Sequence, residues 1–241
     1  MADRSLLRLS ATLLLVGLLL TFLVGLFHVD TSDPNNHIAE FTLYASSNIW
    51  TAVHLGQFIG MTVIIVGLLI LFFALNIHTH TAAWASRFGA IFAVTALALY
   101  GALQAVDGVA LKQAVDAWTR APAAEKAARF ATAEAIRWLE WGFRSYQSFM
   151  LGLSLILFAT AIVLTARVPR MIGYLMGLTG LAYVIQGWVL GAEGFSPNNT
   201  APTLTGYILW LVWSVWLLIV AWRMVDASEA RSNPYVPLSN E

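Results

Sequence analysis

The chain has 241 residues, of which 59% are hydrophobic and 11% are charged, and its formal net charge is zero. Soluble domains carry about 25% charged residues, so this composition is typical of a chain that lies mostly in lipid. There, a charge near the bilayer centre costs about 2.5 to 3.5 kcal/mol. The neutral balance gives no indication of a nucleic-acid partner. The absence of cysteine excludes disulfides, thiolate metal sites, iron–sulfur clusters and cysteine nucleophiles.

The first apolar segment covers residues 9–27 and follows two arginines, Arg4 and Arg8. A secretory signal has a shorter apolar core followed by a small-residue cleavage site, and this segment has neither feature. Since about 20 apolar residues are enough to cross a bilayer, we interpret the segment as the first membrane-spanning helix.

Five further segments have the same character, which gives six predicted spans: residues 9–27, 49–77, 88–109, 146–166, 171–190 and 204–222. Strands are excluded because an open sheet edge leaves unpaired backbone groups in hydrocarbon, and the runs are too long and too uniformly apolar for barrel strands. The sequence therefore predicts an all-α, polytopic bundle that forms one domain over residues 1–225. Residues 226–241 are predicted to be a flexible cytoplasmic tail.

Basic residues indicate the orientation, because cytoplasmic loops carry an excess of Lys and Arg. An inside N-terminus places seven arginines on the cytoplasmic side: Arg4, Arg8, Arg87, Arg167, Arg170, Arg223 and Arg231. The opposite loop, residues 28–48, has no Lys or Arg. Segment 112–144 disagrees, since it carries six basic residues, but four acidic residues accompany them. We expect an N-in, C-in protein of the cell inner (plasma) membrane.

The segment between the third and fourth spans has helical character. Pro122 suits the first turn of a helix, where its missing N–H is harmless. Residues 123–141 are rich in Ala, Glu, Lys and Arg, which are good helix formers. We expect this helix to continue into the fourth span and to form a helical cap on the outer side.

Polar side chains within spans are costly and therefore indicate function. In this chain they gather in the outer half of helices two to five, which predicts an outward-facing polar pocket beneath the cap. The candidate ligand-binding residues are His54, Gln57, Gln104, Asp107, Glu140, Arg144, Gln147 and Gln186.

Two structural interpretations compete with a binding site. Glu140 fits an intrahelical ion pair with Arg137 or Arg144, at the spacing that stabilises helices. Asp107 needs a partner within the membrane, and a salt bridge to Arg144 or a hydrogen bond from Gln57 or His54 would satisfy it. The sequence leaves these alternatives open.

Histidines raise the question of a cofactor. A haem in a helical bundle needs two axial ligands, and His28 is the only other outer-side histidine near a span that could pair with His54. His78 and His80 lie together on the inner side and fit a polar turn better than a zinc site, which needs three or four ligands. No metal site is predicted, and the cofactor stays unknown.

A tight turn, Arg167-Val168-Pro169-Arg170, joins a long apolar helix to a glycine-rich helix containing Gly173, Gly177 and Gly180. Over residues 146–190 the chain in this way resembles a family of bacterial and archaeal membrane proteins known as a domain of unknown function. The resemblance implies a six-helix architecture and a prokaryotic inner membrane. It implies no catalytic residues.

We therefore expect an integral membrane protein, in contact with the lipid bilayer, that binds a small or lipid-like ligand, a partner membrane subunit or a second copy of itself through the pocket. The alternative is a membrane-embedded enzyme, or a haem or metal redox protein, using His54, Asp107 and Glu140. The alternative requires that Asp107 and Glu140 meet in one cavity. A transporter is disfavoured, because no charged residues cross the inner half of the bundle.

Overall fold

The computed structural model describes residues 3–224 except 32 and 79, and these residues contain helices and no strand, which confirms the all-α prediction. The elements are α1 (Arg4–Gly25), α2 (His37–Ser46), α3 (Trp50–Leu75), α4 (His80–Ala105), η1 (Val106–Leu111), α5 (Lys112–Thr119), α6 (Lys126–Thr165), α7 (Arg170–Glu193), η2 (Pro197–Asn199) and α8 (Thr200–Arg223). The predicted tail, residues 226–241, lies outside the described residues.

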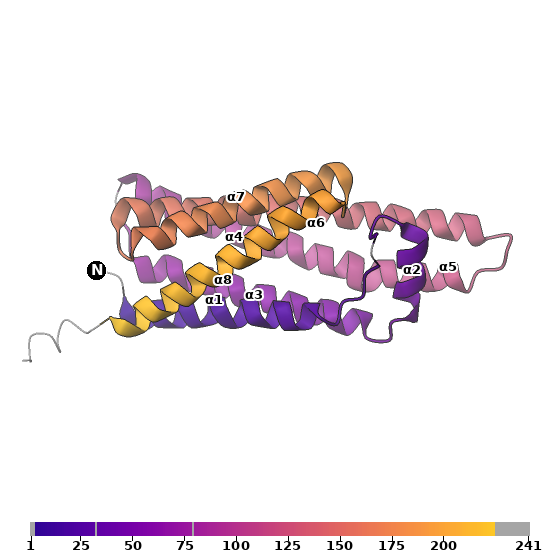
Figure 1. The fold of residues 1–241 in the computed structure, drawn as a ribbon, viewed down its shortest axis with the longest axis horizontal. Coiled ribbons are helices and arrows are strands. Elements are labelled where there is room, and N and C mark those ends of the chain that lie inside the picture. The colour runs from indigo at the N-terminus through magenta and orange to yellow at the C-terminus, as the bar shows by residue number, and fades with distance from the viewer. Residues whose placement is uncertain (1–2, 32, 79, 225–241) are drawn as a thin grey trace, which may run out of the picture.

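Six helices in the described part of the chain are long and apolar enough to cross a membrane, as predicted. Two of them, His80–Thr119 and Lys126–Thr165, have 40 residues each, or about 60 Å at 1.5 Å per residue. That is twice the hydrocarbon thickness of about 30 Å. The predicted span 88–109 is therefore the middle of a much longer helical stretch, and 146–166 is the C-terminal half of α6 and ends one residue beyond it. Both long helices project beyond the others at the end where α2 lies (Figure 1). This end is called the α2–α5 end below.

Helix α6 runs without interruption from Lys126 to Thr165, so the predicted helix of the third loop and the fourth span are one element. It begins later than Pro122, which lies in the preceding turn, where its carbonyl accepts a hydrogen bond from the Glu125 N–H at 2.9 Å. The expectation that Pro122 occupies the first helical turn is therefore wrong. The backbone bends back at 121–125 before it becomes helical.

The segment after the first span is not only a loop. It contains α2, whose first turn is capped by the Asn36 side chain accepting a hydrogen bond from the Ala39 N–H. The apolar face of α2 packs on α5 and α6 through Phe41 and Tyr44, both fully buried. Its ten residues are too few for a span, so hydropathy alone did not predict it.

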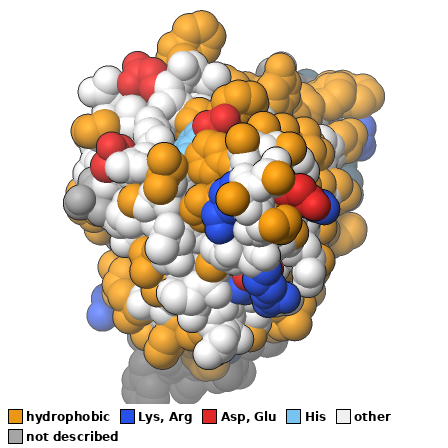
Figure 2. All heavy atoms as spheres, turned by 90° about the vertical axis from the view of Figure 1, so that its right-hand side faces the viewer, with side chains coloured by type: hydrophobic (Ala, Val, Ile, Leu, Met, Phe, Trp, Pro, Cys, Tyr) orange, Lys and Arg blue, Asp and Glu red, His pale blue; other side chains and the backbone are white. Residues whose placement is uncertain are grey.

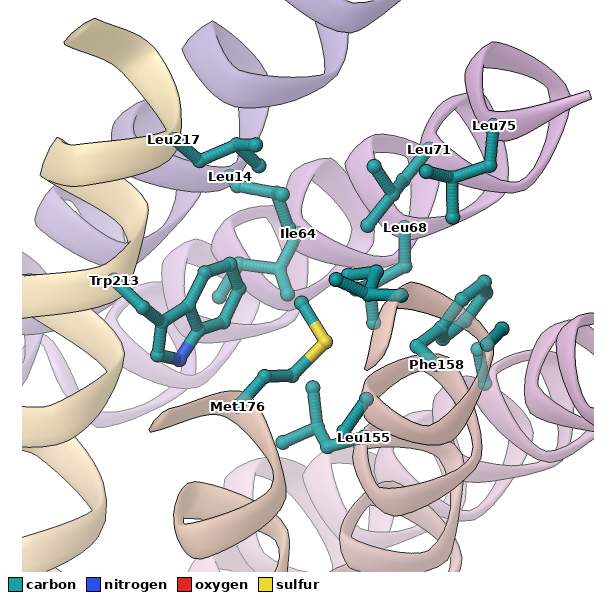
Figure 3. Packing of buried hydrophobic residues seen from close by; sticks show 14 of the residues in the cluster. Leu14, Ile64, Leu68, Leu71, Leu75, Leu155, Phe158, Met176, Trp213 and Leu217 are labelled. Atoms are coloured by element: carbon teal, nitrogen blue, oxygen red, sulfur yellow. The ribbon is translucent and has the colours of Figure 1, made fainter. Parts of the chain in front are cut away.

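Close helix packing builds the core. A Cβ on Gly60 would lie 3.0 Å from the Thr21 backbone nitrogen of α1, and a Cβ on Gly180 would lie 2.6 Å from the Gly152 carbonyl oxygen of α6. Such small residues let helix backbones approach closely in membranes. Between the helices, leucines, Phe158, Met176 and Trp213 interdigitate (Figure 3).

The outside of the bundle is apolar. At most half of the best 18-residue window of each span is buried inside the protein, 28% to 50%, and the remainder exposes side chains such as Phe73, Leu181, Trp188 and Ile208. Exposed apolar area of this extent needs an apolar medium. The chain is a multi-pass membrane protein in contact with the lipid bilayer.

The beginning of α1 and the end of α8 meet at the end opposite α2 and α5 (Figure 1). Arg8 donates hydrogen bonds from Nε to the Ala221 carbonyl and from Nη2 to the Trp222 carbonyl, each 3.1 Å long. These carbonyls belong to the last turn of α8, where cations are favourable. From this contact α8 crosses the bundle obliquely and diverges from α1 (Figure 1).

Candidate ligand cavity and histidine–aspartate cluster

A cavity of about 500 Å³ lies between the diverging helices α1 and α8 and is closed behind by α3, α4, α6 and α7. Three of its lining residues are more than half exposed: Phe22 (56%), Leu26 (65%) and Leu204 (55%). All three lie in or just after α1 or near the start of α8. The cavity is therefore open on the side of the bundle, where lipid meets the protein.

The wall of the cavity changes character along its length. At the α2–α5 end the lining is polar and charged, with His28, Asp30, Asp107, Arg137, Glu140 and Arg144. Toward the bundle centre it is apolar, with Leu18, Met61, Ile64 and Trp210. Trp210 is ten residues into α8, or about 15 Å from that helix end. The cavity is thus amphipathic, and charged side chains are visible at the surface of the same end (Figure 2).

His54 and Asp107 form a buried polar contact between α3 and the segment that follows α4. His54 Nε2 lies 2.9 Å from Asp107 Oδ2, and both side chains are buried. The other imidazole nitrogen, Nδ1, is 2.8 Å from the Trp50 carbonyl oxygen one turn earlier in α3. Of the partners considered from the sequence, Asp107 therefore takes His54 rather than Arg144 or Gln57.

The backbone around Asp107 is a π-helical segment, η1. Two of its carbonyl groups accept hydrogen bonds from α3: that of Asp107 from Trp50 Nε1 at 2.9 Å, and that of Gly108 from Thr51 Oγ1 at 2.8 Å. A Cβ on Gly108 would lie 2.5 Å from the Cβ of His54, so α3 can approach this closely only at glycine. Single-turn π-helical segments often occur at functional sites.

His28 completes the cluster from the loop after α1. Its ring packs on Trp50 and His54 at centroid distances of 4.8 Å and 5.1 Å. Its Nδ1 pairs with Asp30 Oδ2 at 3.0 Å, and the other Asp30 oxygen accepts a 3.4 Å hydrogen bond from the Tyr44 hydroxyl.

The His28–Asp30 pair is electrostatically matched. Burial lowers the pKa of His28, but the hydrogen bond and charge of Asp30 outweigh it and leave that pKa raised. Burial raises the pKa of Asp30, yet His28 and the nearby charge of Arg137 bring it below its usual value. Asp30 is therefore an ionised acceptor behind the His28 ring.

One atom from each of His28, His54 and Asp107 can serve as a metal ligand, and these three atoms lie within 4.8 Å of one another. The two imidazoles are in direct contact at an interplanar angle of 57°. That contact leaves no room for a porphyrin plane between them, which disfavours the haem alternative. Two nitrogens and a carboxylate oxygen are, in contrast, a donor set typical of zinc and related ions.

Arg137 and Glu140 form a buried ion pair one turn apart on α6, with Nη1 and Oε2 2.5 Å apart. The Arg137 guanidinium lies between the rings of Tyr44 and Phe195, 5.6 Å and 4.8 Å from their centroids. The intrahelical pair considered from the sequence is therefore present, with Arg137 as its cation. Glu140 still lines the same cavity as Asp107, as the enzyme alternative requires.

Arg144 lines the cavity one turn further into the bundle. It has no hydrogen bond or ion pair with any described residue, and its contact is with the ring face of Tyr100, 5.9 Å from guanidinium carbon to centroid. It lies 21 residues before the end of α6, about 30 Å away along the helix. This places a guanidinium that makes no direct ion pair with a described residue near the edge of the hydrocarbon.

The predicted glutamines divide into two groups. Gln57 and Gln104 line the cavity and contact each other, with Nε2 of Gln104 3.4 Å from Oε1 of Gln57. Gln147 and Gln186 do not line it. Gln147 is fully buried without a hydrogen-bond partner among the described residues. The Gln186 amide accepts from Ser148 and donates to Thr203, so it links α6, α7 and α8.

The candidate residues chosen from the sequence did not include His28, Asp30 or Arg137, which all line the cavity. His28 was considered only as a haem ligand, and Arg137 only as an ion-pair partner of Glu140. A signal was present, since a histidine and an aspartate two residues apart directly follow the first span. Their role depends on the loop folding back over the bundle, where Asn35 bonds the Glu193 carbonyl and the Phe195 N–H.

Comparison with protein families gives one match, the domain of unknown function DUF4386, over residues 9–221. The chain belongs to the DUF4386 family. The match confirms the resemblance seen over residues 146–190 and extends it across all six spans. No curated protein and no solved structure matches the chain significantly.

Proposed function

We propose that this DUF4386 protein binds a single-chain, anionic amphiphile, with a carboxylate or phosphate head group at Arg144 and its tail along the apolar wall. The observation that carries this proposal is the Arg144 guanidinium, which lines the cavity and makes no hydrogen bond or ion pair with a described residue, since the nearby Glu140 is paired with Arg137. A charge at membrane depth is costly when unpaired. An anionic head group supplies the missing partner, because a guanidinium forms bidentate hydrogen bonds with carboxylate and phosphate groups.

The dimensions of the cavity support a ligand of this class. Its volume of about 500 Å³ falls in the range of small-molecule sites, about 300 to 1,000 Å³. The opening beside Phe22 and Leu204 lies where α1 and α8 diverge, so an amphiphile can enter from the bilayer without crossing water. Gln57, Gln104 and Tyr100 supply neutral donors around the head group.

The proposed location is the inner membrane of a prokaryotic cell, with both termini in the cytoplasm and the charged end of the cavity outside. Arginines near the end where the termini meet support this orientation: Arg4, Arg8, Arg87, Arg167, Arg170 and Arg223. A ligand would then be captured from the outer half of the bilayer or from the space beyond it.

The test is native mass spectrometry of the full chain in a neutral detergent, with dodecyl phosphate, palmitate and uncharged dodecanol as probes. We expect one phosphate or carboxylate probe per chain and no retained dodecanol. Arg144→Gln should weaken binding of the anionic probes by at least about tenfold, because losing one partner of a desolvated charge pair costs about 2 kcal/mol or more. Arg87→Gln is the matched control, because Arg87 is an exposed arginine of α4 that packs on Trp84. This variant should bind the anionic probes as the natural chain does.

Two results would contradict the proposal: equal retention of dodecanol and the anionic probes, or unchanged anion affinity in Arg144→Gln. A folding defect is recognised by comparing both variants with the natural chain by size-exclusion elution. A partner subunit as the occupant predicts instead that the purified chain binds none of the three probes.

A membrane-embedded enzyme is the second candidate, and the observation in its favour is that Asp107 and Glu140 line one cavity. The pairing of Glu140 with Arg137 weighs against it, because that carboxylate already has a cation. The enzyme alternative predicts chemical change in a bound amphiphile. Mass spectrometry of probes and native lipids recovered from the protein distinguishes it from binding alone.

A further inference from the structure

We infer that His28, His54 and Asp107 form a binding site for a divalent transition-metal ion of the zinc class. This site is independent of the proposed amphiphile, and either one can be disproved without the other. Imidazole nitrogens exclude the hard cations calcium and magnesium as preferred occupants, since those ions take oxygen ligands. Two histidines and one carboxylate suit zinc, cobalt and iron.

Hydrogen bonds behind the ligands orient both histidines. The Trp50 carbonyl oxygen is 2.8 Å from Nδ1 of His54, and the Asp30 carboxylate is 3.0 Å from Nδ1 of His28. With Nδ1 donating its proton to these acceptors, Nε2 of each ring is the nitrogen left to bind a metal. Carboxylate or carbonyl acceptors behind metal-bound histidines are the usual second layer of such sites, where they set the tautomer and increase the donor strength of the ring.

An unsatisfied buried atom is the second observation. Asp107 is 7% exposed, and its Oδ1 atom is buried with no hydrogen-bond partner among the described residues. Buried carboxylate oxygens without a partner are unfavourable and need an explanation. His54 contacts this carboxylate only through Oδ2. A metal ion that the carboxylate binds through both oxygens would give Oδ1 the partner that it lacks.

The distances fit an ion after a small adjustment. Zinc bound at about 2.0 to 2.1 Å in tetrahedral geometry keeps its ligand atoms about 3.3 Å apart. His54 Nε2 and Asp107 Oδ2 are 2.9 Å apart, and one candidate ligand atom from each of the three residues lies within 4.8 Å of the other two. Separating the first pair by about 0.4 Å and moving His28 inward by up to about 1.5 Å completes the set. His28 lies in the loop after α1, whereas His54 and Asp107 lie in helical segments. His28 is therefore the ligand whose backbone is not held by helical hydrogen bonds.

Three protein ligands leave one tetrahedral position open, as in catalytic rather than structural zinc sites. His28 and Asp107 both line the cavity, whereas His54, the third ligand, is not among its lining residues. The open position therefore faces the cavity. A ligand with a donor atom in its head group could reach the ion there, close to the Arg137–Glu140 pair.

The experiment uses the full chain purified in neutral detergent without chelators, dialysed against zinc chloride and then against metal-free buffer. We expect close to one zinc per chain by elemental mass spectrometry, and tetrahedral-type visible absorption when cobalt(II) replaces zinc. His54→Ala and Asp107→Asn should each abolish stoichiometric zinc. His78→Gln, an exposed histidine at the opposite end, should retain it.

Two further variants separate metal binding from folding. His28→Ala removes a ligand in the loop and should lose zinc while eluting like the natural chain in size exclusion. Asp30→Asn keeps all three ligands and should weaken zinc affinity about 10- to 100-fold, the effect typical of removing a carboxylate behind a metal-bound histidine. The inference is overturned if the natural chain retains no stoichiometric zinc, if His28→Ala retains it fully, or if His78→Gln loses it.

Discussion

The buried pair Arg137–Glu140 is the residue-level feature with the largest expected energetic consequence. Both side chains are about 2% exposed, so neither charge is hydrated in the folded protein. A well-made buried pair contributes little net stability, but removing one partner leaves an isolated buried charge. Tyr44 and Phe195 pack on the guanidinium, which reinforces its position at the cavity wall.

A single variant and a double variant test this interpretation. Arg137→Met should lower the free energy of unfolding by about 3 to 5 kcal/mol, because Glu140 is left buried without its cation. The double variant Arg137→Met, Glu140→Leu should recover most of that loss. Unfolding in a detergent titration followed by tryptophan fluorescence measures both, and a double variant as unstable as the single one would contradict the reasoning.

At the scale of the elements, helix α6 both packs closely on α7 and lines the charged part of the cavity. Its half toward the α2–α5 end presents Arg137, Glu140 and Arg144 to the cavity, while Gly152 in its other half lies against Gly180 of α7. A tight α6–α7 contact holds the helix in one rotational setting. That setting decides which of its polar side chains face the cavity.

Two identical substitutions on glycines test the contact. Gly180→Ala should destabilise the protein by about 1 to 3 kcal/mol, because the new methyl group would lie 2.6 Å from the Gly152 carbonyl oxygen. Gly142→Ala adds the same group where no described atom lies within 4 Å. It should be neutral or stabilising by up to about 1 kcal/mol, since alanine favours helix. Thermal unfolding compares the two, and similar melting temperatures would refute the packing argument.

At the scale of the whole molecule, the two ends of the bundle differ. One end gathers the start of α1, the end of α8 and several arginines, and the other carries α2, α5 and the charged part of the cavity (Figures 1 and 2). Six spans place both described ends of the chain on the same side. The asymmetry implies that the charged part of the cavity lies toward one side of the membrane.

Because the chain has no cysteine, single cysteines report its orientation without background. Ala124→Cys, in the exposed turn between α5 and α6, should react with a membrane-impermeant maleimide in intact cells. Ser5→Cys, exposed near the start of α1, should react only in inverted membrane vesicles. The opposite pattern would reverse the orientation and place the cavity on the cytoplasmic side.

The sequence was most informative where local chemistry decides the outcome. Apolar runs of membrane length identified the six spans, since lipid contact depends on each segment's own composition. It also predicted that Asp107, Glu140, Arg144, Gln57 and Gln104 lie near one another, because alternating spans bring all five toward the same side of the membrane, and all five line the cavity. Helix α2 was missed because ten residues packed by Phe41 and Tyr44 give no span-length signal.

Which polar groups meet was decided only by the tertiary structure. His54 and Asp107 are 53 residues apart and touch because Gly108 and the η1 turn let α3 approach. Gln147 and Gln186 share the polar pattern yet lie outside the cavity lining. The hydropathy and helical periodicity of a sequence determine the depth of a residue in the membrane and the side of the helix on which it lies. The partner it meets depends on how neighbouring helices are rotated and crossed, which no single segment encodes.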